Sequence, residues 1–147
     1  MADYITYKLT GADKLSATFR TLSQELQRQI VVPAAKDAMD IVLQDARNRA
    51  QQIDDPSTPR DISRNIALIE DKKFFNETGS TKVSVGVKKS RRGRLGGNTF
   101  YWWFVELGTS RSRAQPFMRN ALGLNQQAVF SEFISSAKFQ LLKLDLD

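Results

Sequence analysis

The chain has 147 residues and carries 22 lysines and arginines against 16 aspartates and glutamates, which gives a formal net charge of +6. Its hydrophobic fraction of 41% predicts one globular domain with its own core, and no apolar run approaches the ~20 residues of a membrane span. Cysteine and histidine are both absent, which excludes disulfides, thiolate chemistry and the commonest metal ligand, and the lack of a secretory signal predicts an intracellular protein with no membrane partner.

The N-terminal half is expected to form one strand and two helices. Residues Tyr4–Leu9 alternate in a way typical of a β-strand. Apolar residues then recur at helical spacing from Leu15 to Ile30, and Pro33 is expected to separate this helix from a second one that ends near Gln52. One face of the second helix is rich in alanine, which permits close packing. That face comprises Ala35, Ala38, Met39, Val42, Ala46, Ala50 and Ile53.

The middle of the chain predicts a loop followed by a β-hairpin. Residues Asp54–Pro59 are a loop by composition, and a helical turn is expected from Arg60 to Arg64. Two strands, Asn65–Phe75 and Thr81–Lys88, are then joined through a turn at Asn76–Ser80. Valine alternates with polar or small residues in the second strand, which indicates that one face of the hairpin meets solvent.

A basic, glycine-rich stretch, residues 88–98, is expected to be a mobile loop. Lysine and arginine displace counterions from phosphates, which would give salt-sensitive attraction to DNA of any sequence. A solvated loop whose charge only maintains solubility is an equally weighted alternative. The residues expected to face DNA are Lys88, Lys89, Arg91, Arg92 and Arg94.

Five consecutive aromatic residues, from Phe100 to Phe104, predict a return strand that anchors a core or a subunit contact, with a helical end as the alternative. Neighbouring side chains on a strand point to opposite faces. We therefore expect one of Trp102 and Trp103 in the core and the other at a subunit interface.

A sharp corner and two helices are expected to complete the chain. Gly108 permits a positive φ directly after the hydrophobic run, and Pro116 suits the first turn of a helix. Phe117 is then the first apolar side chain of that helix and is expected to pack under the aromatic strand. The two helices are expected at Pro116–Leu122 and Asn125–Leu142, with a kink at Gly123.

The corner resembles a motif of the neck, or head–tail joining, family of long-tailed bacteriophages, whose members are also described as minor tail or tail-completion proteins. The matching residues are Glu106, Leu107, Gly108, Thr109, Ala114, Pro116 and Phe117. The helix opening at Gly11–Leu15 resembles the family too. The chain departs from the family at Ser57–Ile62, where many relatives carry Asp-Thr-Gly-x-Leu.

This resemblance implies a structural virion protein, made in the bacterial host cytoplasm, that forms a homo-oligomeric ring at the head–tail junction. Sixfold symmetry is favoured over twelvefold. The implied partners are adjacent head-closure and tail-terminator or tail-tube proteins, with double-stranded DNA passing transiently through the lumen. The subunit or ring contacts are expected at Trp102, Trp103, Glu106, Arg111 and Arg113.

No residue pattern indicates an enzyme, a metal site or a cofactor. Glu106 is the most tempting catalytic carboxylate, but it lacks a nearby second carboxylate or histidine to shift its pKa. We expect it instead to pair with an arginine, with Arg111 and Arg113 close by, or with backbone N–H groups at the Gly108 turn. Asp54 and Asp55 supply too few ligands for a hard cation.

The elements together predict a single α+β domain over residues 1–147, with a small antiparallel sheet of about four strands. The sheet is expected to pack against the N-terminal helices and a C-terminal helix. The predicted function is the ring-forming neck protein; the alternative is a small basic module that binds nucleic acid without sequence preference.

Overall fold

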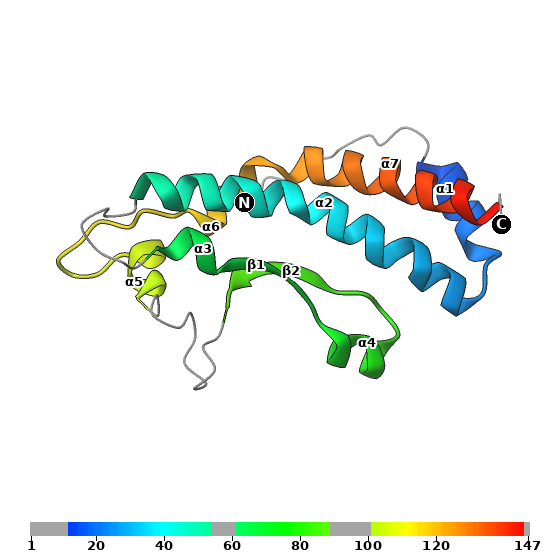
Figure 1. Cartoon of the computed structure of the whole chain (residues 1–147), viewed down its shortest axis with the longest axis horizontal. Coiled ribbons are helices and arrows are strands. Elements are labelled where there is room, and N and C mark those ends of the chain that lie inside the picture. Colours follow the sequence, from blue (N-terminus) through cyan, green and yellow to red (C-terminus); the bar gives the residue numbers. More distant parts are fainter. Residues whose placement is uncertain (1–11, 54–60, 89–100, 146–147) are drawn as a thin grey trace, which may run out of the picture.

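Two long helices lying side by side form the spine of the molecule (Figure 1). The computed structural model describes residues 12–53, 61–88 and 101–145. Helix α2 (Gln24–Ile53) packs along α7 (Gln126–Asp145), and α1 (Ala12–Arg20) also contacts α7. Four further elements contact α2: α3 (Ile62–Asn65), β1 (Ile66–Glu70), β2 (Val83–Val87) and α6 (Met118–Leu124). α4 (Lys72–Thr78) lies between the two strands in the chain, and α5 (Trp102–Leu107) precedes α6.

The break between the first two helices lies before Gln24, so the prediction that Pro33 separates them was wrong. The Oγ of Ser23 accepts the N–H of Leu26 at 3.3 Å and so caps the start of α2. Pro33 lies inside this helix and cannot donate to the carbonyl four residues earlier, a loss of about 3 kcal/mol in an isolated helix. The burial of Ile30 and Ala34 on either side of it offsets that loss.

The alanine-rich face of α2 is buried, as its spacing predicted. Ala38, Ala46 and Ala50 are at most 2% exposed, because small side chains let the neighbouring elements approach the backbone of α2 closely. The main core lies on this face and includes Val42, Ile66, Val87, Ala121 and Phe117. A second, smaller cluster joins Ile30 and Ala34 of α2 to Ala137 of α7.

The sheet has two antiparallel strands within the described residues, and not the four that were expected. β1 pairs with β2 in a register that sets Ile66 opposite Val87 and Glu70 opposite Val83. The guanidinium of Arg47 donates to the carbonyl of Ile66 at 2.9 and 3.2 Å, which ties this hairpin to α2. The expected N-terminal strand, Tyr4–Leu9, lies outside the described residues.

A short helix interrupts the hairpin where a continued strand and a turn at Asn76–Ser80 were predicted. The first strand ends at Glu70, and α4 follows it. Asp71 caps α4 by accepting the N–H of Phe74 at 2.9 Å, and Gly79 ends it with φ 72°. The two caps stabilise a helix that the aromatic residues alone did not indicate.

The aromatic segment is also helical: residues 102–107 form α5 and do not form a return strand. Trp102 and Val105 pack against the main core while Trp103, Phe104 and Leu107 are exposed. At about 100° per residue, this division corresponds to two sides of a helix and does not alternate as a strand would.

The C-terminal helices begin slightly later than predicted. α6 begins at Met118, so Pro116 precedes the helix and does not occupy its first turn. The chain breaks at Asn125 and not at Gly123, because the Asn125 amide donates to the carbonyl of Ala121 and to Asp45, both at 2.7 Å. Among the described residues, no helix combines the length and apolar character needed to cross a membrane.

Phe117 is 1% exposed at the centre of the main core, and Phe117→Ala should test its packing. We expect the free energy of unfolding to fall by about 3–5 kcal/mol, because the neighbouring elements can fill the cavity only in part. The matched control is Phe139→Ala, which removes the same atoms from a side chain 63% exposed and should change stability by about 0.5 kcal/mol or less. Urea denaturation of both variants measures this difference, and equal losses would contradict the assignment of the core.

Candidate functional site

A buried carboxylate joins α5 to the start of α6. Glu106 is 4% exposed, and its Oε2 accepts the backbone N–H groups of Phe117 at 2.9 Å and Met118 at 3.0 Å. Its Oε1 accepts both the backbone N–H and the Nε of Arg119, at 3.0 and 3.1 Å. The first N–H groups of a helix have no partner within the helix, so Glu106 satisfies three donors that would otherwise be unpaired. We call this set of contacts the Glu106 clamp.

The predicted structural role of Glu106 is confirmed in kind, since it pairs with an arginine and with backbone N–H groups. The donors, however, come from Arg119 and the start of α6, and not from Arg111, Arg113 or the Gly108 turn. Arg119 also donates its Nη2 to the backbone carbonyl of Glu106 at 2.9 Å. Sequence reasoning missed Arg119, although the predicted helix start nearby was a signal that unpaired N–H groups would need an acceptor there.

The Gly108 corner explains the spacing of the motif residues. Gly108 has φ 77° and ψ 174°, a conformation essentially restricted to glycine, so its predicted positive φ is confirmed. A Cβ at this position would lie 2.7 Å from the backbone nitrogen of Ala114. The Thr109 Oγ1 accepts the N–H groups of Arg111 and Ser112, which closes the turn. The chain therefore reverses and returns along α5 to deliver Phe117 to the clamp.

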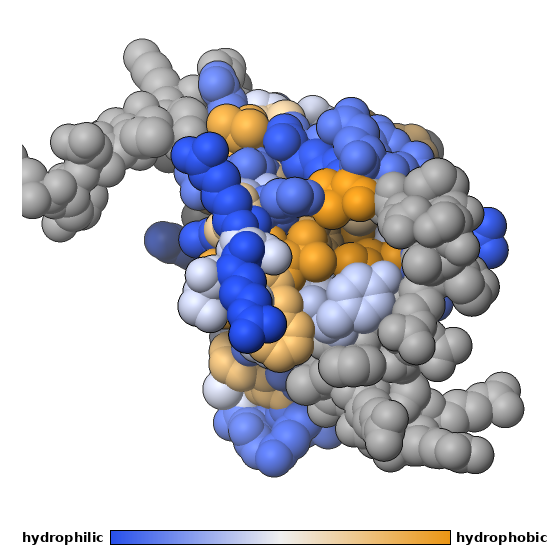
Figure 2. Space-filling model, turned by 90° about the vertical axis from the view of Figure 1, so that its left-hand side faces the viewer, coloured by the Kyte–Doolittle hydropathy of each residue, from blue (hydrophilic) through white to orange (hydrophobic). Residues whose placement is uncertain are grey.

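The side of α5 away from the core presents large apolar side chains to solvent. Trp103, Phe104 and Leu107 are 46%, 57% and 59% exposed. Trp103 stacks on Trp102, with ring centroids 4.3 Å apart, and Trp102 itself packs against the main core. Figure 2 shows hydrophobic residues gathered on this end of the molecule among hydrophilic ones. We call Trp103, Phe104 and Leu107 the α5 face.

Arg111 and Arg113 are exposed in the turn that follows α5. Trp102 packs against the main core and Trp103 is exposed, and the expectation that one of the two lies at a subunit interface stays a prediction. The contact roles of Trp102, Trp103, Glu106, Arg111 and Arg113 stay predictions. Because the carboxylate of Glu106 is fully used inside the chain, its contribution to a contact would be to hold α5 in place.

The basic loop lies almost wholly outside the described residues. Lys88 is exposed at the end of β2, and its N–H donates to the carbonyl of Asn65 at 2.8 Å. Lys89, Arg91, Arg92 and Arg94 fall in the undescribed range, so their role in facing DNA stays a prediction. Within the described ranges, no group of three or more acidic, histidine or cysteine side chains is placed to hold a metal ion.

The site is therefore a surface suited to protein contact. Exposed apolar side chains that lie next to one another on a soluble protein mark contact surfaces, and aromatic residues are enriched there. The Glu106 clamp and the stacked tryptophans hold this surface in one arrangement before any partner arrives, which reduces the entropy lost on binding.

Comparison with known proteins adds one match. The family model described as "Bacteriophage HK97-gp10, putative tail-component" matches residues 13–108, well over half of the chain. The matched range includes α5, Glu106 and Gly108, and it ends before the donors of the clamp. No curated protein and no solved structure matches the chain.

Glu106→Gln should destabilise the fold, because the amide nitrogen cannot accept a hydrogen bond and would face N–H donors. We expect a loss of about 2–4 kcal/mol in the free energy of unfolding. Glu132→Gln removes the same charge from an exposed position on α7 and should change stability by about 0.5 kcal/mol or less. If thermal melting shows the two variants to be equally stable, the clamp does not stabilise the corner.

Two glycine substitutions should change stability in opposite directions. Gly108→Ala places a Cβ against the backbone of Ala114 in a strained conformation and should cost about 1–3 kcal/mol. Gly123→Ala adds a Cβ where nothing lies within 4 Å, inside α6, and should stabilise the protein by about 0.5–1 kcal/mol. Differential scanning calorimetry measures the melting temperature of both variants. A Gly108→Ala variant that melts at or above the wild-type temperature would contradict the described geometry of the corner.

Proposed function

The chain belongs to the HK97-gp10-like family of bacteriophage tail components, and on that premise we propose that it is a ring-forming subunit of the head–tail junction. Membership of such a family implies a structural protein of the virion that contacts other virion proteins. The match over residues 13–108 is the observation that carries the proposal. The match confirms the family that the motif residues indicated, and it covers Glu106, Leu107 and Gly108 of that motif.

The proposed mechanism is geometric. Identical subunits repeat one heterologous contact, in which two different surfaces meet, until the accumulated rotation closes a ring. The α5 face supports such a contact, because it offers three large apolar side chains on a helix that the Glu106 clamp holds rigidly. We favour a sixfold ring over a twelvefold one. Head-closure proteins are the proposed neighbours on one side, and tail-terminator or tail-tube proteins on the other.

DNA is proposed to pass through the ring during packaging and ejection. The net charge of +6 and the basic residues from Lys88 to Arg94 support attraction to phosphates. The attraction should be weak and salt-sensitive, because a tight grip would obstruct passage. In this proposal the subunit performs no catalysis, and Glu106 is a structural residue. The basic nucleic-acid-binding module remains the alternative, and no contact among the described residues favours it.

Disruption of the gene in a phage that encodes this chain tests the proposal. We expect electron micrographs to show filled heads and free tails that fail to join, and we expect complementation with the wild-type gene to restore whole virions. Light scattering on the purified protein should detect a closed oligomer.

A chain with Arg91, Arg92 and Arg94 replaced by serine separates the two functions. The ring proposal predicts that this variant still joins heads to tails, because the contacts that close the ring lie elsewhere.

Two outcomes would contradict the ring proposal. The first is normal virions from the phage in which the gene is disrupted. The second is a monomer that binds DNA tightly and loses that binding in the serine variant, which would favour the nucleic-acid-binding module.

A further inference from the structure

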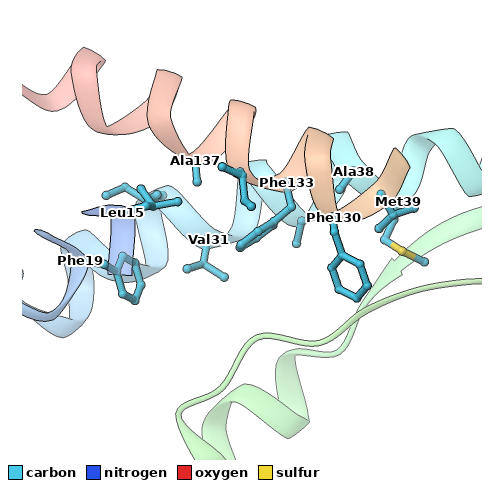
Figure 3. A pocket seen from close by; sticks show the side chains of 12 residues that line it. Leu15, Phe19, Val31, Ala38, Met39, Phe130, Phe133 and Ala137 are labelled. Carbon is cyan, nitrogen blue, oxygen red and sulfur yellow. The ribbon is translucent and has the colours of Figure 1, made fainter. Parts of the chain in front are cut away.

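An apolar groove runs between the two long helices. It has a volume of about 550 Å³ and is lined by α1, α2 and α7 (Figure 3). All of its lining residues are apolar; Phe19, Val31, Met39, Phe130 and Phe133 contribute the largest side chains. Phe130 is 46% exposed at the groove. With no charged residue in its lining, the groove offers nothing to a phosphate backbone and selects an apolar occupant.

The α5 face matches the groove in chemistry, because both surfaces are apolar. Trp103, Phe104 and Leu107 fall within an arc of about 100° on α5, on the side away from Val105 and Trp102. They project from a short helix as a ridge, whereas the groove is a hollow between two long helices. The volume of the groove lies in the range of pockets that enclose a small ligand, so it can accept the tips of several large side chains.

The two surfaces lie on different parts of an elongated molecule. α5 lies at one end, and α1, which forms part of the groove wall, lies at the other (Figure 1). The ridge of a chain therefore does not reach its own groove, but it can reach the groove of another copy. When the ridge of one copy occupies the groove of the next, the growing assembly still has one free ridge and one free groove after each added subunit. Ring growth requires such a contact.

We propose that the α5 face of one subunit docks into the groove between α1, α2 and α7 of the next. This inference rests on the proposed ring and specifies its subunit contact. A contact of groove with groove would leave two hollows facing each other, and a contact of ridge with ridge would leave the groove exposed. The ridge-in-groove contact covers both apolar surfaces at once, which is why we favour a second copy as the occupant.

Cross-linking in the full chain tests the contact directly, because the sequence contains no cysteine. The double variant Leu107→Cys/Phe130→Cys places one thiol on the ridge and one in the groove. A short thiol–thiol cross-linker should convert it into a ladder of dimers, trimers and larger species. A mixture of the two single variants should stop at dimers, because each chain then carries only one of the two thiols.

The matched control is Leu107→Cys/Phe139→Cys. Phe139 is 63% exposed and lies about 180° around α7 from Phe130, so its thiol should stay away from the ridge of the next subunit. We expect the control to lose the ladder entirely. A ladder of equal strength in the control would overturn the ridge-in-groove contact.

The failure of the contact can be distinguished from the failure of the proposed function. If the wild-type protein forms a closed oligomer while the double variant assembles without cross-links, the contact is wrong and the ring stands. Both proposals are wrong if three results are found together: the wild-type protein stays monomeric at every concentration, the double variant forms no ladder, and virions assemble without the gene.

Discussion

The buried carboxylate of Glu106 needs hydrogen-bond donors around it, and this requirement organises the second half of the chain. Glu106 can be buried only if donors surround it, since an unpaired charge in a core is prohibitively unfavourable. The donors are the first N–H groups of α6 and the side chain of Arg119, so the chain must turn at Gly108 and return along α5. With Glu106 held toward the core, Phe104 lies about 160° away around the axis of α5 and is exposed to solvent. The clamp thus fixes which side of α5 carries the exposed apolar residues.

Local signals allowed parts of this corner to be predicted, but not how they assemble. The positive φ of Gly108, the burial of Phe117 and the structural role of Glu106 each follow from a residue type at a particular place in the sequence. The partner Arg119 lies 13 residues from Glu106, and no local rule connects them. The groove was not predicted for a similar reason: α1 and α2 follow each other in the sequence, but α7, which completes the groove, lies far from both.

Elsewhere, packing overrode the preferences of individual residues. The periodicity of the N-terminal region correctly predicted helices and the buried alanine face, but α2 continues through Pro33 because Ile30 and Ala34 are buried beside it. Aromatic residues favour strands where they can pack on the face of a sheet. The segment around Trp102 packs against the main core as a helix instead. The caps of α4 were visible in the sequence as Asp71 and Gly79, yet the aromatic residues between them suggested a longer strand.

The pairing of α2 with α7 also bears on the synthesis of the protein. α2 leaves the ribosome well before α7, so Ile30 and Ala34 of α2 lack their partner Ala137 until α7 has been synthesised. A nascent chain cannot form the groove early, because α7 supplies one of its walls. Premature stop codons before α7 should therefore yield chains that chaperones and proteases remove, with no partly folded subunit able to enter a growing assembly.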